Sequence, residues 1–161
     1  MTIKVGDRLP SVTLRQVTPE GPKEITTDAF FAGKKVALFA VPGAFTPACS
    51  QRHLPGFVDK ASDIKAKGVD EIACVAVNDA AVMGAWGKDQ RTEGKVSMLA
   101  DGSGDFARAL RLELDLTKNG LGIRSKRYSM LVDNGVVKSL NIEAQPGQVD
   151  TSSAETMLKA L

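Results

Sequence analysis

The chain of 161 residues is long enough to bury one well-formed core, and no linker-like stretch divides it, which predicts a single domain over residues 1–161. Hydrophobic residues at 43% and charged residues at 25% are ordinary for a globular protein and argue against a disordered or membrane-embedded chain. The net charge of +2 comes from 21 basic and 19 acidic residues scattered along the chain, so nucleic acid is a poor expectation as a partner.

The N-terminus and the cysteines indicate the compartment. Residues 1–7 contain Asp7 and lack the long apolar run of a secretory signal, so we expect a cytoplasmic protein. Cys49 and Cys74 are too few for a disulfide framework and should rest as thiols in a reducing compartment.

The first strong pattern is a strand, a turn and a helix. Prolines and glycines among short alternating runs in residues 5–30 favour a small hairpin or an edge strand. Residues 35–41 are apolar and partly β-branched, as in a buried strand. Thr46 is then a good N-cap, and Pro47 suits the first helical position. Cys49 therefore lies in the first helical turn, where free N–H groups and the helix dipole favour a reactive thiolate.

Helices and strands alternate through the middle of the chain. The helix opened by Thr46 continues to Gly68 with one apolar face, and Pro55 should kink it. Residues 71–78 read as a second buried strand, completing a βαβ unit with parallel pairing. A helix over residues 80–90, a short strand over residues 96–100 and a further helix near Phe106 follow.

The last third predicts a hairpin and a final helix. Residues 113–126 are charged and contain glycine, which favours a loop at the mouth of a pocket. Residues 128–140 give the strongest hairpin signal, with Asn134 and Gly135 at the turn. Ser152 and Glu155 have the spacing of a capping box for the final helix. Together these elements predict an α/β protein with a thioredoxin-like fold, a mixed central β-sheet flanked by helices on both faces.

The turn also carries a family resemblance. Pro42, Thr46 and Cys49 match the Pro-x-x-x-Thr-x-x-Cys signature of the peroxiredoxins, and residues 41–47 resemble the peroxiredoxin-5-like, or type II, subfamily. The likeness extends to Leu54-Pro55-Gly56-Phe57, Val77-Asn78-Asp79, Leu99-Ala100-Asp101-Gly102 and Arg127-Tyr128-Ser129-Met130. It implies a thiol peroxidase that reduces hydrogen peroxide and small organic hydroperoxides without metal, haem or other cofactor, often as a homodimer, with a role in antioxidant defence.

The resemblance also assigns roles to residues. Cys49 resembles the peroxidatic cysteine, which attacks the peroxide and becomes a sulfenic acid. Thr46 is expected to align sulfur and peroxide, and Pro42 to shield the sulfenic acid. Arg127 is similar in context to the active-site arginine, whose charge favours the thiolate. Spacing alone does not distinguish Arg127 from its basic neighbours Arg124 and Lys126 as the active-site cation.

The chain departs from many relatives in its second cysteine. No cysteine follows Cys74, so the usual C-terminal resolving cysteine is missing. Cys74 lies on a predicted buried strand, where it reads either as a bystander or as a resolving thiol. An external thiol, glutathione with glutaredoxin or thioredoxin, is therefore expected as reductant.

Other chemistry stays open on the sequence. His53 follows Cys49 by four residues, a pairing that would suit a Cys-dependent hydrolase, although a lone exposed histidine is more often plain surface. Residues 102–107 fit a loose G-x-G-x-x-A nucleotide pattern that lacks its ribose-binding acid. The cysteine and histidine spacing predicts no metal site. Trp86 is expected in the core or at a subunit contact. A redox-sensing binding module is the non-enzymatic alternative.

Overall fold

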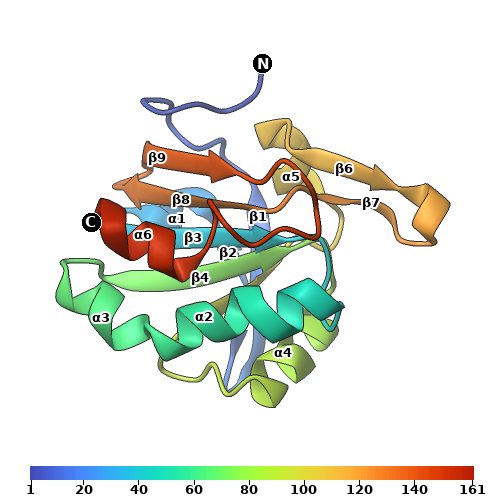
Figure 1. The fold of residues 1–161 in the computed structure, drawn as a ribbon, viewed down its shortest axis with the longest axis horizontal. Coiled ribbons are helices and arrows are strands. Elements are labelled where there is room, and N and C mark those ends of the chain that lie inside the picture. Colours follow the sequence, from blue (N-terminus) through green and yellow to red (C-terminus); the bar gives the residue numbers. More distant parts are fainter.

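The computed structural model describes residues 1–161 and is built around one mixed, seven-stranded sheet (Figure 1). In spatial order its strands are β2 (Gly21–Thr26), β1 (Thr13–Thr18), β5 (Ser97–Ala100), β4 (Glu71–Ala76), β3 (Lys35–Val41), β8 (Tyr128–Asp133) and β9 (Val136–Ile142). Strands β3, β4 and β5 are parallel, while β8 and β1 pair antiparallel on either side of them. The predicted βαβ unit, the edge hairpin and the mixed sheet are confirmed.

Helices cover both faces of this sheet. One face carries the π-helical turn η1 (Cys49–His53), α2 (Leu54–Asp59), α3 (Ala61–Ala66), α4 (Ala80–Asp89) and α6 (Ala154–Ala160); the other carries α1 (Thr27–Phe31) and α5 (Asp105–Leu110). The short helix α1 is not predicted from the sequence. None of the helices combines the length and the apolar character that crossing a membrane requires.

Alternation along the central strands separates two apolar cores. Phe39 of β3 and its partner Cys74 of β4 face the core under α2, α3, α4 and α6. Leu38 and Ala73, one residue earlier, face the core under α1 and α5. Because both faces of these strands are covered, they read as continuous apolar runs instead of alternating ones.

The helix after β3 begins where the sequence predicts, but it is irregular. Helical backbone starts at Pro47, and the Leu54 N–H then donates to the Cys49 carbonyl, five residues back. Pro55 has no N–H to donate and its ring crowds the carbonyl four residues earlier, so a disturbance in the turn before it is expected. The disturbance takes the form of the π-helical turn η1, which contains Cys49.

The prediction of a loop over residues 113–126 is wrong. This segment forms a separate two-stranded hairpin, β6 (Glu113–Leu116) and β7 (Gly122–Ser125), joined through the short 3-10 turn η2 (Thr117–Asn119). Leu114 and Leu116 alternate with acidic residues at the period of a strand, a signal that the charge of the segment obscured. Gly120 and Gly122 adopt φ of +75° and +68°, which lets the chain turn tightly there.

The C-terminal hairpin is confirmed, whereas the final cap is shifted. Asn134 and Gly135 have φ of +49° and +81°, as a two-residue hairpin turn with positive φ requires. Helix α6 is capped by Ser153, whose Oγ accepts from the Thr156 N–H at 3.2 Å, and not by Ser152. The predicted capping box is therefore wrong by one residue, because Ser152 has a different partner.

Candidate active site

The loop between β3 and the helix holds a constrained backbone. Phe45 adopts φ of +64°, a conformation that non-glycine residues rarely take. The Ala44 N–H donates to Asn78 Oδ1 at 2.9 Å, and the Ser50 N–H donates to the Thr46 carbonyl at 2.9 Å. The loop is thus tied to the end of β4 on one side and to the helix on the other. This fixes the start of the helix and the position of Cys49.

Cys49 is buried between two polar side chains that come from different parts of the chain. Its Sγ lies 2.9 Å from Thr46 Oγ1 and 3.1 Å from a guanidinium nitrogen of Arg127. The structure therefore brings together the cysteine, threonine and arginine singled out from the sequence. Pro42 is buried directly after β3, at the base of the same loop.

Thr46 differs from the N-cap expected of it. Its hydroxyl lies 2.7 Å from the Gly43 carbonyl as well as 2.9 Å from the cysteine sulfur, and it caps no backbone N–H. A hydroxyl has one hydrogen, so Thr46 donates either to that carbonyl or to the sulfur. A protonated Cys49 can donate to Thr46 Oγ1 while Thr46 donates to Gly43. A thiolate leaves the threonine hydrogen free to turn toward sulfur or substrate.

Arg127 is a buried cation with three fixed partners and is only 2% exposed. Its Nε donates to the Pro146 carbonyl at 2.9 Å, one terminal nitrogen contacts His53 Nδ1 at 3.0 Å, and the other contacts Cys49 Sγ. None of the ion pairs in the protein involves Arg127. A buried cation is costly unless an anion accompanies it, and the thiolate of Cys49 is the anion that this geometry provides.

The prediction of His53 as a surface residue is wrong. His53 is 1% exposed, and its ring lies 4.8 Å, centroid to centroid, from that of Phe39. His53 Nε2 lies 2.9 Å from the Ser152 carbonyl, which can only accept, so Nε2 carries the hydrogen and Nδ1 accepts from Arg127. The spacing of Cys49, His53 and Phe57, four residues apart along one helical face, is the sequence signal for this burial.

This arrangement removes His53 as a base for acyl transfer. Burial, together with the charge of Arg127, lowers the pKa of His53 to about 3, so the ring is neutral at physiological pH. Its free nitrogen already accepts from Arg127, and the guanidinium is what contacts Cys49. The cysteine and histidine therefore do not form the direct pair that a Cys-dependent hydrolase needs.

The lowered pKa of His53 predicts an acid-dependent loss of stability. Between a folded pKa of about 3 and an unfolded value near 6.5, the unfolded chain binds one more proton. The contribution is complete above the unfolded value and falls as the pH drops, by up to about 1.4 kcal/mol per pH unit. Urea unfolding from about pH 7.5 to about pH 4.5, followed by fluorescence of the single tryptophan, Trp86, measures this slope.

The matched variant for this test is His53→Gln, because glutamine does not titrate. We expect the free energy of unfolding of the variant to depend less steeply on pH below about 6.5 than that of the parent. Equal slopes in the two proteins would show that the histidine is not the group responsible.

Cys74 is fully buried in β4, in the same apolar core as Cys49. Burial raises the pKa of the Cys74 thiol well above its ordinary value, and the neighbouring Cys49 raises it further. Cys74 is therefore a protonated, unreactive thiol in the folded protein. No disulfide joins the two cysteines.

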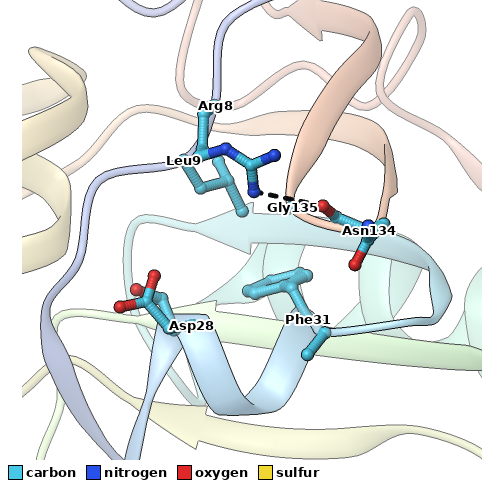
Figure 2. Close-up of a pocket in the computed structure, with 8 residues that line it drawn as sticks. Arg8, Leu9, Asp28, Phe31, Asn134 and Gly135 are labelled. Carbon is cyan, nitrogen blue, oxygen red and sulfur yellow. Dashed lines mark hydrogen bonds between the residues drawn. The ribbon is translucent and has the colours of Figure 1, made fainter.

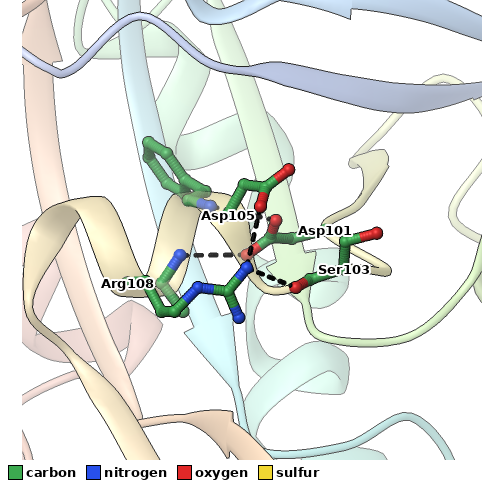
Figure 3. Close-up of polar contacts among 6 residues, drawn as sticks. Asp101, Ser103, Asp105 and Arg108 are labelled. Atoms are coloured by element: carbon green, nitrogen blue, oxygen red, sulfur yellow. Dashed lines mark hydrogen bonds and ion pairs between the residues drawn. The ribbon is translucent and has the colours of Figure 1, made fainter.

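The glycine-rich segment at residues 102–107 is a helix start and not a nucleotide site. Asp101 accepts from the Phe106 N–H at 3.0 Å and from the Ala107 N–H at 2.9 Å, while Arg108 contacts Asp105 and the Ser103 carbonyl (Figure 3). A pyrophosphate would need those N–H groups at the N-terminus of α5. The carboxylate already occupies them.

A cavity of about 270 Å³ opens between the N-terminal segment, α1 and the β8–β9 turn, with Arg8, Asp28 and Phe31 among its walls (Figure 2). None of the residues that line it contacts Cys49. No cluster of three or more His, Cys, Asp or Glu side chains is arranged to hold a metal ion.

Trp86 supports the site from α4, as a core residue. It is fully buried, and its indole N–H donates to Ser50 Oγ at 3.0 Å. Gln90, four residues later, donates to the Ser50 carbonyl at 3.2 Å. Both contacts tie Ser50 of the π-helical turn to α4 and the residue after it. Phe45 lies at 6.4 Å from the Trp86 ring, between centroids, and stays 52% exposed.

Comparisons with known proteins agree with this geometry. The Redoxin family model matches residues 4–158. Peroxiredoxin-2E, chloroplastic, of Arabidopsis thaliana is 54% identical over 164 residues, covering 99% of this chain and 70% of that protein. The crystal structure of reduced Prx3 from Vibrio vulnificus in complex with hydrogen peroxide has a TM-score of 0.94 at 53% identity, over 99% of both chains. Peroxiredoxin 5 from Alvinella pompejana has a TM-score of 0.86 at 39% identity, over 98% of this chain and 97% of that chain. The thioredoxin-like fold expected from the sequence is confirmed.

Proposed function

The chain belongs to the type II peroxiredoxins, thiol peroxidases that reduce peroxides, and on that premise we propose that Cys49 is the thiolate that attacks the peroxide. The observation that carries this assignment is the contact of 3.1 Å between Cys49 Sγ and Arg127, a buried cation without a carboxylate partner. No other thiol in the chain has such a neighbour, because Cys74 lies among apolar side chains.

The proposed reaction needs few groups. The thiolate attacks the nearer peroxide oxygen, the O–O bond breaks, and Cys49 becomes a sulfenic acid. The electron pair of the broken bond leaves with the second oxygen, which takes up a proton and departs as water or alcohol. Arg127 stabilises the negative charge on that oxygen, and the Thr46 hydroxyl orients the peroxide against the sulfur. Pro42, at the base of the loop, limits the access of water to the sulfenic acid.

We propose that an external thiol reduces the sulfenic acid, with glutathione and glutaredoxin or thioredoxin as the physiological source. Cys74 is the only other cysteine, and its thiol is protonated and held in a central strand. Cys49 is itself fully buried, so a reductant reaches it only when the first helical turn opens. The turn that must open is the π-helical turn η1, and π-helical turns are frequent at functional sites.

Replacing Cys74 tests the external reductant. Cys74→Ala should turn over peroxide with glutathione and glutaredoxin at the parental rate, within about twofold, because the alanine removes only a resting thiol. Intact mass after one equivalent of hydrogen peroxide should show one added oxygen at Cys49 in both proteins. A parent that loses two hydrogens while the folded variant does not would assign resolution to Cys74. Repeated turnover also separates an enzyme from a redox sensor that is oxidised once.

We propose that the protein is a homodimer, a state that the family suggests, and that it lies in the cytoplasm. Phe45, in the active-site loop, is 52% exposed, and we propose that the dimer interface covers it. Sedimentation equilibrium should then measure a molecular mass twice that of the chain. A monomer mass at micromolar protein concentration would contradict the proposed dimer. A cytoplasmic location is tested by cell fractionation and immunodetection.

A further inference from the structure

Glu143 is a buried carboxylate that the proposed reaction leaves without a role. It follows β9 directly and is 8% exposed. One of its oxygens accepts from the Ser152 N–H at 2.8 Å, from the Ser152 hydroxyl at 2.6 Å and from the Asp150 N–H at 2.7 Å. Burying a carboxylate costs free energy, and charge-assisted hydrogen bonds such as these three offset the cost.

These bonds close the segment between β9 and α6 into a loop. Glu143 lies at its start and Ser152 at its end, so the side chain joins both ends. The Glu143 N–H also donates to the Arg127 carbonyl at 3.0 Å, which fixes the base of the loop to β8. Within the loop, residues 144–148 are exposed, and two arginine side chains also hold it: Arg52 donates to the Gly147 carbonyl at 2.6 Å and Arg127 donates to the Pro146 carbonyl at 2.9 Å.

The closed loop supplies two carbonyl groups to the active site. The Pro146 carbonyl accepts from Arg127 Nε at 2.9 Å, and the Ser152 carbonyl accepts from His53 Nε2 at 2.9 Å. His53 in turn accepts from Arg127 on its other nitrogen. Each of the two supports that orient the guanidinium therefore depends on where this loop lies.

We infer that the ionised Glu143 is a positioning residue for the peroxidase reaction, a role that rests on the proposed function of Cys49 and Arg127. It acts through Ser152, His53 and Pro146, and it touches neither sulfur nor substrate. By holding the two loop carbonyls in place, it keeps one guanidinium nitrogen of Arg127 aimed at the sulfur of Cys49.

The charge state of Glu143 is consistent with this role. Burial raises the pKa of Glu143, but the hydrogen bonds from Ser152 and Asp150 and the nearby His53 outweigh burial and hold the pKa below its usual value. The carboxylate is therefore ionised at neutral pH, where its hydrogen bonds to Ser152 and Asp150 keep the loop closed.

Loss of the hydrogen bonds of Glu143 should be measurable at the sulfur. A displacement of about 1 Å of a catalytic group costs on the order of a hundredfold in rate. For Glu143→Ala we expect kcat/KM for hydrogen peroxide to fall about 10- to 100-fold. Alkylation of Cys49 by iodoacetamide should shift to higher pH, because a misplaced cation favours the thiolate less. Glu143→Gln should change kcat/KM and the pH of alkylation in the same directions but by less, because its amide oxygen still accepts hydrogen bonds although it carries no charge.

The experiment compares these variants with the exposed Glu155→Ala, which removes a carboxylate near the same loop and should match the parent. A purely structural role would lower the melting temperature of Glu143→Ala and leave kcat/KM and the alkylation profile of the folded protein unchanged; that result overturns the inference. If Glu143→Ala does not fold, the same comparison of melting temperature, kcat/KM and alkylation profile is made with Glu143→Gln.

A double-mutant cycle shows whether the effect passes through Arg127. In an Arg127→Gln background, Glu143→Ala should cause no further shift in Cys49 alkylation, since the group it positions is gone. A shift of the same size in both backgrounds contradicts the inference. Alkylation needs no peroxide, so this readout stays informative even if the protein consumed none, an outcome that would count against the proposed function alone.

Discussion

Cys49→Ser is expected to lower peroxide consumption by at least about 10³-fold, since a hydroxyl is a far weaker nucleophile than a thiolate at neutral pH. The serine oxygen would keep a hydrogen-bond partner in both Thr46 and Arg127, so the fold should persist. The change therefore separates chemistry from structure. Stopped-flow or coupled-assay measurement of hydrogen peroxide loss under glutathione and glutaredoxin gives the rate.

The control for this variant is the second cysteine. Cys74→Ser removes a thiol from the same core and should keep activity, although its buried hydroxyl costs stability on the order of 1–3 kcal/mol. Parental turnover by Cys49→Ser, at matched melting temperature, would refute the assignment of the nucleophile. Equal losses in both variants would instead point to a disulfide between the two cysteines as an obligatory intermediate.

Local patterns were sufficient to predict most of the fold. The apolar run over residues 35–41, Pro47 at the start of the helix and the Asn134-Gly135 turn each fix the backbone through their own chemistry, and all appear where expected. Residues 113–126 form a hairpin instead of the predicted loop, because their charge obscures a short alternation of apolar and acidic residues. Ser152 is not the cap of the final helix, because its N–H and hydroxyl donate to Glu143, nine positions earlier in the chain.

Only part of the site could be predicted from the sequence, because some of its residues are far apart along the chain. Thr46 and Cys49 are close along the chain, so their meeting follows from one helical turn. Arg127, His53 and Glu143 meet through three separate elements, with 74 positions between the first two. Nothing local distinguishes Arg127 from Arg124 or Lys126. In the structure, Arg124 donates to the Leu121 and Val77 carbonyls and Lys126 is exposed, so burial against the sulfur is what selects Arg127.

Arg127→Gln is expected to reduce kcat/KM for hydrogen peroxide by about 10²- to 10³-fold, the cost of removing a charged donor aimed at a developing negative charge. Alkylation of Cys49 should move to higher pH, because the thiolate loses its only cationic contact. The charge of Arg127 is one of the causes that lower the pKa of His53, so that pKa should rise in the variant, which NMR titration of the single histidine can follow. Lys126→Gln, an adjacent exposed cation, should change none of these three quantities.

Arg127→Lys separates the charge from the geometry. A lysine keeps the cation, but its single ammonium group cannot reach the Pro146 carbonyl, His53 and the sulfur at once, as the planar guanidinium does. If charge alone favoured the thiolate, the lysine variant would alkylate like the parent and reduce peroxide at a parental rate. We expect alkylation at a pH between those of the parent and Arg127→Gln, and a kcat/KM reduced about tenfold or more, since the leaving oxygen needs a donor at a fixed position. A lysine variant with parental kcat/KM would show that the reaction does not need the supports that His53 and the 143–152 loop give to Arg127. It would also contradict the role inferred for Glu143.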